Sequence, residues 1–584
     1  ALLFSDGFWN GGDPTTVTSD WDGDGATGVG PGNRNNVTVA DVAAYFYDTD
    51  LRPDLDNAVP TDQFDAANYQ HLVTYTIAFG LKGTLEDTDG DGWPNPPLDR
   101  TDNWYRNGNQ LDRIEDMWHA AWNSRGKYFN AQRPQELFEQ VRAALTDIGS
   151  RIGGAASAAA NSGSISSSSR IFQAKFDSSD WHGELLAFPV NDDGTLGATA
   201  VWDSNALLSA KTNDELRSRR VFTWNDDGST PGGTAFQWSS ISSQQAALLN
   251  RNYDGVPDPV GAERGQARLD YVLGVNSNEE SRGGTWRDRV NKLGDIVNSD
   301  PMYVGFPPFF YPFDGYNNFF NANVNRTGVI YVGANDGMLH AIKESTGEEM
   351  FAYVPDAVFE NLPRLTNPDY SHTFYVDGAP GYGDAYWDGS WKSVVSGGLR
   401  TGGQAVYALD VTNPDSFTAS DVLWEFSDEV DADLGYVWGE PQIKRMQNGR
   451  WAVIVGNGLN NTEADGHAST TGQGALFIIY IEPGIDGWAP GDYVKIPVPG
   501  GSTETPNGLF TPAAADIDGD SKVDFIYAGD RFGRMWKFDV TGDEASWEID
   551  FGGAPFFTTP SGSPISDRPA IAAHPQGRRL GQLV

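Results

Sequence analysis

The chain of 584 residues carries 80 acidic and 40 basic side chains, a formal net charge of −40, and no cysteine. This charge excludes binding of nucleic acid or of an anionic membrane surface by bulk electrostatics, and the lack of cysteine excludes disulfides, thiolate catalysis and cysteine-ligated metals. A chain this long exceeds one ordinary core, so two or more domains are expected. Its apolar runs are too short to cross a bilayer, so we expect no direct membrane insertion.

The N-terminal segment, residues 1–152, alternates predicted strands with predicted helices. Its apolar positions follow a strand pattern in some stretches and a helical period in others, and Thr38 is the predicted cap of the first helix. The predicted elements are a strand over 1–7, a helix over 37–51, a strand over 72–81 and helices over 113–124 and 133–152. Such alternation predicts a parallel sheet covered on both sides. Because the first residues lie inside a predicted strand, we expect the later part of a domain that starts upstream.

Glycine, alanine and serine dominate residues 153–169, which predicts a linker, because such side chains bury too little surface to become ordered. Over 170–584 helical patterns almost vanish. Strand–turn–strand units recur instead, over 171–190, 328–354, 393–426, 452–483 and 524–540. Each unit is a small sheet that cannot cover both its faces alone, so radial packing into a β-propeller is predicted. We expect this propeller to be truncated at its C-terminus. Separate β-sandwiches are the alternative, although they would not repeat the same strand–turn–strand pattern.

The segment DIDGDSKVD concentrates carboxylates in one tight loop. It offers oxygen ligands at relative positions 1, 3, 5, 7 and 9, which are Asp516, Asp518, Asp520, the backbone carbonyl of Lys522, and Asp524. Calcium prefers about six to eight oxygen ligands, and four carboxylates at this spacing repel one another without a cation. The loop therefore predicts a calcium site, and a run of Asx-turns without metal is the alternative.

Three further loops repeat this spacing in part. The first would bind calcium through Asp87, Asp89, Asp91, the carbonyl of Trp93, and Asn95. The second would use Asn250, Asn252, Asp254, the carbonyl of Val256, and Asp258, of which the neutral amides lower the affinity. The third offers Asp20, Asp22 and Asp24 and lacks an acid at position 9. A surface turn without metal is the alternative for each.

Familiar catalytic motifs are missing from the sequence. Seven histidines are scattered along it, and no HExxH metalloprotease motif, phosphate-binding P-loop or GxSxG nucleophile elbow occurs. We therefore predict that the protein is not an enzyme and that it has no catalytic residues and no organic cofactor.

Four stretches resemble the PilY1/PilC family of type IV pilus-tip proteins. They are KLGDIVNSDPMYVG (292–305), GVIYVGANDGMLHAI (328–342), YVDGAPGYGDAYWDGSWKSVVSGGLRTGGQAVYALDVTNP (375–414) and AAADIDGDSKVDFIYAGDRFGRMWKFDV (513–540). DVAAYFYDTDLRP (41–53) and QHLVTYTIAFG (70–80) resemble the von Willebrand A-like domain of the same family. The resemblance implies a partial α/β von Willebrand A-like domain over 1–152 and an all-β, modified, seven-bladed, quinoprotein-like propeller over 170–584.

The same resemblance implies a calcium-binding pilus-tip adhesin and assembly factor that regulates pilus extension, retraction and surface attachment. It implies export through the periplasm and outer membrane to the cell surface, with minor pilins as partners and a host receptor or an abiotic surface as the adhesion target. Asp6 would be one ligand of a Mg²⁺ or Ca²⁺ adhesion site completed by upstream residues. A quinoprotein dehydrogenase using pyrroloquinoline quinone (PQQ), and a purely structural surface or filament protein, are the alternatives. The lack of cysteine counts against the enzyme, because many such enzymes stack a vicinal disulfide on the quinone.

Overall fold

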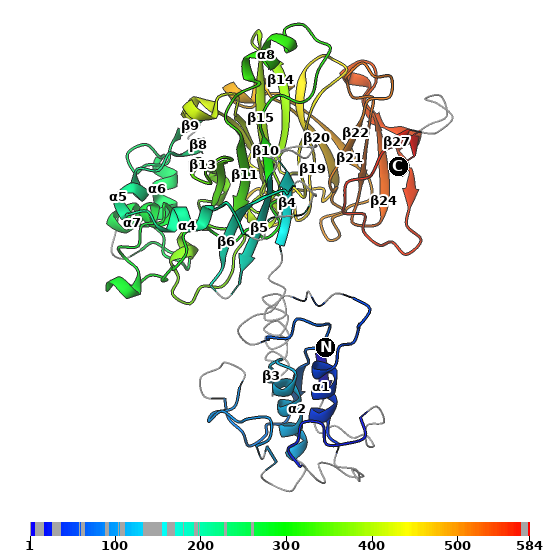
Figure 1. The fold of residues 1–584 in the computed structure, drawn as a ribbon. Coiled ribbons are helices and arrows are strands. Elements are labelled where there is room, and N and C mark those ends of the chain that lie inside the picture. Colours follow the sequence, from blue (N-terminus) through cyan, green and yellow to red (C-terminus); the bar gives the residue numbers. More distant parts are fainter. Residues whose placement is uncertain are drawn as a thin grey trace. The chain divides into compact units, whose positions relative to one another are not determined.

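The computed structural model divides the chain into two compact units, Ala1–Gly153 and Gly154–Val584 (Figure 1). The residues that it describes are 2–5, 17–25, 37–55, 57, 59, 65–87, 93–102, 104–105, 111–131, 155–160, 170–178, 180–191, 195, 197, 199–226, 231–258, 262–573 and 582–583. Among these, no helix combines the length and the apolar character needed to span a membrane.

The N-terminal unit is built on three parallel strands in the order β1-β2-β3. Its elements are β1 (Leu2–Ser5), α1 (Val39–Asp48), β2 (Tyr75–Phe79), α2 (Asp112–Asn123) and β3 (Tyr128–Ala131). The structure confirms the predicted strands over 1–7 and 72–81 and the predicted helices over 37–51 and 113–124. The helix predicted over 133–152 lies outside the described residues. The von Willebrand A-like identity of this unit stays a prediction.

Local sequence explains where α1 begins and how it packs. The side chain of Thr38 accepts a hydrogen bond from the backbone N–H of Asp41, and the Asp41 carboxylate accepts one from the backbone N–H of Thr38. This capping box satisfies N–H groups that the helix itself leaves free. Ala40 and Ala43 of α1 pack against Ala120 of α2, and their small side chains bring the two helices close together.

Burial differs between the described strands of this sheet, and its predicted coverage on two faces stays a prediction. β2 is buried along four of its five residues. Leu2, Leu3 and Phe4 of β1 are between 38% and 49% exposed. The reason is the placement of α2, which packs against β2 and β3.

The described part of the C-terminal unit contains five β-sheets of four to six strands, arranged in chain order. The first comprises β4 (Ala155–Ala160), β5 (Arg170–Asp177), β6 (His182–Pro189) and β7 (Trp202–Asp203). The second comprises β10 (Met302–Val304), β11 (Val329–Ala334), β12 (Met338–Lys343), β13 (Glu349–Val354), β8 (Val221–Asn225) and β9 (Gly232–Ala235), in that order across the sheet. The third comprises β14 (Gly381–Trp387), β15 (Ser390–Gly398), β16 (Ala405–Asp410) and β17 (Val422–Ser427).

The fourth sheet comprises β18 (Gln442–Arg445), β19 (Trp451–Gly456), β20 (Gly474–Tyr480) and β21 (Tyr493–Val498). The fifth comprises β22 (Ala513–Ala515), β23 (Phe525–Gly529), β24 (Arg534–Asp539), β25 (Glu548–Ile549) and β26 (Phe557–Thr558). A two-stranded sheet of β27 (Ala572–Ala573) and β28 (Gln582–Leu583) follows. Strand pairing is antiparallel throughout these sheets except between β13 and β8, which are parallel.

Neighbouring sheets of this unit share hydrophobic cores. Phe172 of the first sheet lies in one core with Ile330 of the second. The second, third and fourth sheets share the largest core. Ile454 of the fourth sheet and Ile526 of the fifth lie in another. Serial packing of small antiparallel sheets is how propeller blades bury their faces, so the cores agree with the predicted propeller. The count of seven blades stays a prediction.

Two predictions for this unit are wrong in part. The predicted linker over 153–169 contains β4, which pairs with β5. Backbone hydrogen bonds of that ladder supply an order that small side chains do not. The unit is also not all-β, because the described part of the insertion between β7 and β10 contains four α-helices besides β8 and β9. Its helices are α4 (Ser204–Ser209), α5 (Asn213–Arg217), α6 (Ser243–Leu249) and α7 (Ala262–Val272), and the unit also contains α8 (Tyr316–Asn323) and α9 (Asp550–Gly553).

Candidate metal centres

Asp516, Asp518 and Asp524 converge in the loop that joins β22 to β23. One carboxylate oxygen of each lies within 4.8 Å of the other two. The loop turns back through the left-handed residues Gly519 (φ +81°) and Ser521 (φ +65°), whose N–H groups donate to the Asp516 carboxylate at 2.6 and 2.9 Å. Glycine adopts such a conformation without strain, which suits a tight turn. The fold thus brings three of the predicted ligands together.

Asp520 stands apart from these three residues. Its carboxylate accepts hydrogen bonds from the backbone N–H of Lys522 at 2.9 Å and from the Lys522 Nζ at 2.7 Å. The hydrogen bond from the Lys522 side chain lowers the pKa of Asp520. The sequence indicated only the backbone carbonyl of Lys522 as a ligand, and its ammonium was missed although it lies two residues away. For Asp520 to bind a cation, this ion pair has to open.

Asp524 is the buried member of the group, at 7% exposure, whereas Asp516 and Asp518 are exposed. Its two oxygens accept hydrogen bonds from the backbone N–H of Ile517 at 2.7 Å and from Nε2 of Gln447 at 2.8 Å. Burial raises the pKa of Asp524, and the charges of Asp518 and Asp516 raise it further. Carboxylates that oppose one another in this way form an oxygen cage suited to a divalent cation.

Two predicted sites lie wholly or partly outside the described residues. Asp6 is not described. Of the loop over 87–95, the structure describes Asp87, Trp93 and Asn95 but not Asp89 and Asp91. Metal binding at both places stays a prediction.

The loop over 250–258 uses its acids differently from the prediction. Asp258 forms an ion pair with Arg268, and both side chains are almost fully buried. The Oδ1 atom of Asn252 accepts hydrogen bonds from the N–H groups of Asp254 at 3.0 Å and Val256 at 3.2 Å. Arg268 neutralises the acid that was expected to complete the ligand set. The geometry therefore favours an Asx-turn anchored by an ion pair.

The loop with Asp20, Asp22 and Asp24 turns inward. Asp20 fastens the turn, because its carboxylate accepts hydrogen bonds from the N–H groups of Gly23 at 2.7 Å and Gly25 at 3.0 Å. Oδ1 of Asp22 accepts one from the N–H of Asp24 at 3.2 Å. A solvated turn, the alternative for this loop, does not describe Asp22, which is only 4% exposed.

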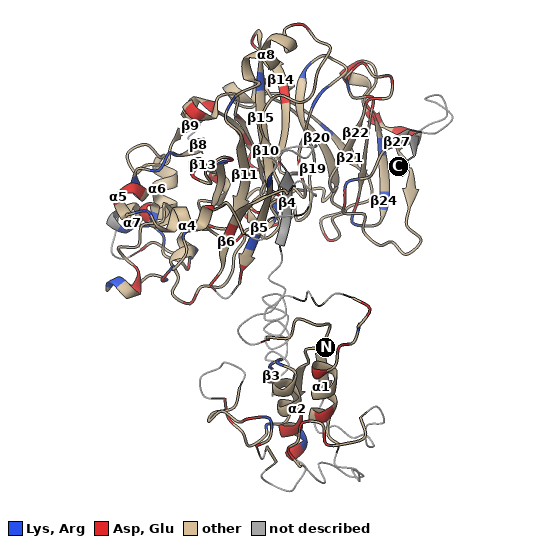
Figure 2. Cartoon of the chain, viewed as in Figure 1, with Lys and Arg blue, Asp and Glu red and all other residues tan. Residues whose placement is uncertain are grey.

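Two helices add side chains to this loop that sequence reasoning missed. Asp41 of α1 groups with Asp20 and Asp22, and His119 of α2 groups with Asp22 and Asp24, with ligand atoms of each group within 4.8 Å of one another. Figure 2 shows the acidic residues of α1 and α2. No local spacing connects these positions, because only the packing of α1 on α2 brings them together. The signal that the sequence offers is a histidine beside the apolar positions Met117 and Trp118 of the predicted helix.

Burial sets the protonation of this group. His119 is completely buried, and burial lowers its pKa to about 3. Its Nε2 lies 3.0 Å from the carbonyl oxygen of Arg100, and its Nδ1 lies 3.5 Å from Oδ2 of Asp24. Because its pKa is lowered so far, His119 is uncharged at neutral pH. Burial, followed by the charges of Asp41 and Asp24, raises the pKa of Asp22 to about 8.

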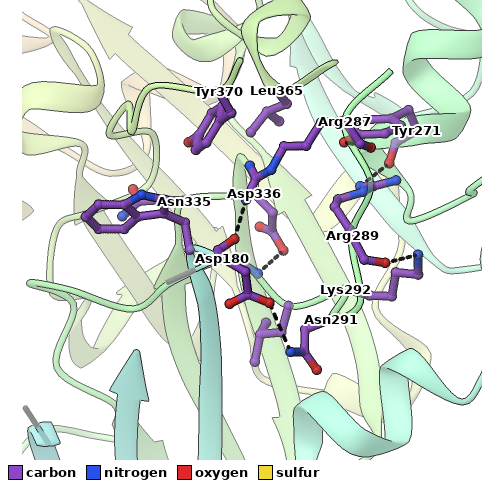
Figure 3. Close-up of a pocket in the computed structure, with 13 residues that line it drawn as sticks. Asp180, Tyr271, Arg287, Arg289, Asn291, Lys292, Asn335, Asp336, Leu365 and Tyr370 are labelled. Atoms are coloured by element: carbon purple, nitrogen blue, oxygen red, sulfur yellow. Dashed lines mark hydrogen bonds between the residues drawn. The ribbon is translucent and has the colours of Figure 1, made fainter. Parts of the chain in front are cut away.

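The C-terminal unit has a polar pocket of about 30 Å³, room for about one or two water molecules (Figure 3). Arg287, Arg289 and Lys292 line it, and each has a partner. The Arg287 guanidinium lies 3.9 Å from the ring centroid of Tyr370. Arg289 pairs with Glu279 at 3.0 Å, and Lys292 donates to the Arg289 carbonyl at 3.3 Å. These cations tie neighbouring segments together, and we assign no ligand to the pocket.

A buried ionic network adjoins this pocket at β12. Arg219 donates two hydrogen bonds of 2.7 Å to Glu349, whose Oε1 lies 2.8 Å from Nδ1 of His340. Nε2 of His340 lies 3.2 Å from both oxygens of Asp336, which also accepts from the N–H of Gly294 at 3.0 Å. Burial alone would raise the pKa of Glu349, but Arg219 and His340 lower it. The network links the insertion to the second sheet.

Comparisons with known proteins cover the whole chain. Residues 293–554 match the family model described as the PilY1 beta-propeller domain. The full chain is 32% identical over 665 aligned residues to the type IV pilus biogenesis factor PilY1 of Pseudomonas aeruginosa strain PAK, and covers 54% of that protein. A PilY1 homolog of Xylella fastidiosa is 35% identical over 521 residues, which cover 80% of this chain and 34% of that protein. The chain thus spans about half the length, or less, of these curated relatives.

Among solved structures, the crystal structure of the Pseudomonas aeruginosa PilY1 C-terminal domain aligns with 48% of this chain and 58% of that domain. The sequence identity is 33% and the TM-score is 0.40.

Proposed function

Because the chain belongs to the PilY1 family, whose curated members are named type IV pilus biogenesis factors, we propose that it acts in the biogenesis of type IV pili. The match of the propeller region and the alignment along the whole chain support this role. The relatives are named as biogenesis factors and not as enzymes, which supports a non-enzymatic function. In this proposal the protein is exported to the cell surface, contacts minor pilins at the pilus tip and promotes attachment to a host or abiotic surface.

Calcium is the proposed ligand of the loop over 516–524. The observation that carries this part is the convergence of Asp516, Asp518 and Asp524 between two strands of one sheet. Asp520 and the Lys522 carbonyl would complete an all-oxygen set, which suits calcium. The ion would neutralise the repulsion that burial and neighbouring charges create at Asp524. It would thereby hold the connection between β22 and β23 in one conformation.

Calorimetry tests the calcium site directly. The chain is freed of metal with a chelator and titrated with Ca²⁺, as wild type, as Asp524→Asn and as Asp539→Asn. Asp539 is a matched control, because its carboxylate caps a turn in the same sheet through Thr541 at 2.9 and 2.5 Å. We expect Asp524→Asn to weaken binding by about 10-fold or more, because it removes a charged ligand from an oxygen cage. Equal calcium affinity in all three proteins would refute the site.

A cellular assay tests the biogenesis role separately. The gene that encodes this chain is deleted and then restored as wild type or as the Asp524→Asn variant. We expect surface pili to disappear on deletion and to return with the wild-type gene, and minor pilins to co-purify with its product. Unchanged piliation in the deletion strain would contradict the biogenesis role, whatever the calcium affinity.

A further inference from the structure

We propose that the N-terminal unit has a second metal centre, in which Asp22, Asp24 and Nδ1 of His119 bind a divalent transition-metal ion such as Zn²⁺. This site lies in a different unit from the calcium loop and includes a nitrogen ligand. It is independent of the proposed role in pilus biogenesis.

The donor atoms are close enough to share one ion. They lie within 4.8 Å of one another, and the three side chains are at most 2% exposed. Two ligands of a tetrahedral zinc ion, each at about 2.0–2.1 Å from it, are about 3.3 Å apart. The separation between Oδ2 of Asp24 and Nδ1 of His119 is 3.5 Å, whereas Oδ2 of Asp22 lies 3.7 Å from Nε2, the other nitrogen of the ring. Asp24 is therefore already placed beside Nδ1, and Asp22 would turn its carboxylate toward the same nitrogen to share the ion.

The hydrogen bonds around His119 leave its Nδ1 as a ligand atom. Nε2 lies 3.0 Å from the Arg100 carbonyl, so the ring N–H is on that nitrogen and Nδ1 carries a lone pair. This lone pair faces the Asp24 carboxylate, and the Tyr105 hydroxyl, which lies 3.5 Å from Nδ1, donates its proton to Asp116 at the shorter distance of 3.0 Å. A lone pair against a carboxylate is repulsive, whereas a cation between them attracts both. Metal-binding histidines commonly donate their other N–H to a backbone carbonyl in this way.

Asn123 gives an independent indication of a missing ligand. Its side chain is 3% exposed, and its Oδ1 has no hydrogen-bond partner among the described residues. Its Nδ2 donates to Oδ2 of Asp22 at 2.8 Å, and Asn123 lies one helical turn after His119 on α2. Leaving a buried carbonyl oxygen without a donor is destabilising, because the oxygen has lost its hydrogen bonds to water. A metal-bound water would donate to this oxygen, because a three-residue site leaves the fourth position of a tetrahedral ion open.

The ligand set selects the class of metal. Calcium and magnesium take oxygen ligands, whereas imidazole combined with carboxylates suits zinc and its first-row neighbours. Asp41 completes the surroundings, since its carboxylate accepts hydrogen bonds from the N–H groups of Trp21 at 2.5 Å and Asp22 at 3.2 Å. These bonds fix the loop so that Asp22 and Asp24 point at α2. The competing interpretation is that the buried carboxylates hold a proton in place of a metal.

The test uses the whole chain, stripped with a chelator and titrated with Zn²⁺ by calorimetry and with Co²⁺ by visible absorption. His119→Gln removes the nitrogen ligand. His71→Gln is the matched control, because both ring nitrogens of His71 have partners, Tyr69 O at 2.7 Å and Asp65 Oδ2 at 2.8 Å. We expect His119→Gln to weaken one zinc site by about 10-fold or more and to abolish the cobalt absorption bands. The His71→Gln control should keep both.

Further variants remove the remaining ambiguities. If circular dichroism shows that His119→Gln does not fold, the nearly isosteric Asp24→Asn replaces it and should weaken zinc by the same factor. Asp524→Asn should bind zinc like the wild type, which separates this site from the calcium loop. Equal zinc affinity and equal cobalt spectra in wild type, His119→Gln and Asp24→Asn would overturn the proposal and favour the shared proton. Calcium binding that is tighter than zinc at this site would overturn the assignment of the metal.

Discussion

Raising the pH through the pKa of His340 should weaken the second sheet of the C-terminal unit. The ring is completely buried between Glu349 and Asp336, at 2.8 and 3.2 Å. Burial alone would lower the pKa of His340, but the charge and hydrogen bonds of Asp336 and Glu349 outweigh it and raise the pKa from 6.5 to about 9. The His340 side chain is therefore protonated in the folded chain at neutral pH.

The size of this effect follows from the two pKa values. The difference between about 9 in the folded chain and 6.5 in the unfolded chain, at about 1.4 kcal/mol per pH unit, corresponds to roughly 3 kcal/mol. Because the pKa is raised on folding, the folded chain binds this proton more tightly than the unfolded chain. The stabilisation is complete below pH 6.5 and is lost as the pH rises through 9.

Urea denaturation between pH 6.5 and 9.5 measures the loss, in wild type and in His340→Gln with a chelator present. Asp22, with a pKa of about 8, and Glu425, with a pKa of about 7, titrate in the same interval. Both groups are common to the two proteins, so their contributions cancel in the difference. We expect the stability advantage of the wild type to shrink by roughly 3 kcal/mol across the interval. Parallel curves for the two proteins would refute a charged His340.

Three further predictions concern single side chains. Without calcium, Asp524→Asn should have a Tm no lower than that of the wild type, because it removes a carboxylate that Asp516 and Asp518 repel. The variant should also lose the calcium-induced rise in Tm. A lower metal-free Tm would contradict this account. Lys522→Gln should bind calcium about 2- to 10-fold more tightly by calorimetry, because Asp520 is freed from its ion pair, and weaker binding would show that the ammonium does not compete. Thr38→Ala should destabilise the N-terminal unit by about 1 kcal/mol through loss of the capping box with Asp41, whereas Thr38→Ser should keep most of it; equal urea midpoints would argue against the cap.

Local patterns predicted the fold well where the structure depends on local interactions. The helices over 37–51 and 113–124 follow from apolar periodicity and a capping threonine, and the recurring hairpins follow from strand–turn–strand cadence. The helical insertion had local signals that were overlooked. Thr212 and Ser242 each begin a capping box, completed three residues later by Glu215 and Gln245. The strand β4 had no such signal, because its pairing with β5 depends on backbone hydrogen bonds and not on side-chain character.

The candidate sites show the same difference between local and long-range interactions. The loop over 516–524 carries its ligands within nine residues, so spacing alone predicted it. His119, Asp41 and Asn123 reach the loop at Asp22 only through the packing of α1 on α2, which one sequence does not reveal. The basic side chains that pair with these carboxylates were also missed in the sequence. Whether a basic side chain turns toward a loop depends on the folded structure.

The two candidate metal centres differ in what balances their carboxylates when no metal is bound. In the propeller loop, Lys522 holds Asp520 at 2.7 Å and water reaches Asp516 and Asp518, so the metal-free loop is a stable alternative state. In the calcium proposal, a cation there would exchange with an ammonium, and its concentration would bias the loop between two arrangements. In the N-terminal unit the carboxylates of Asp22 and Asp24 are shut off from water, so an ion bound between them would exchange less readily than one in the propeller loop. If both proposals hold, the propeller loop is the one that would respond to ambient calcium, and the N-terminal centre would bind a fixed structural ion.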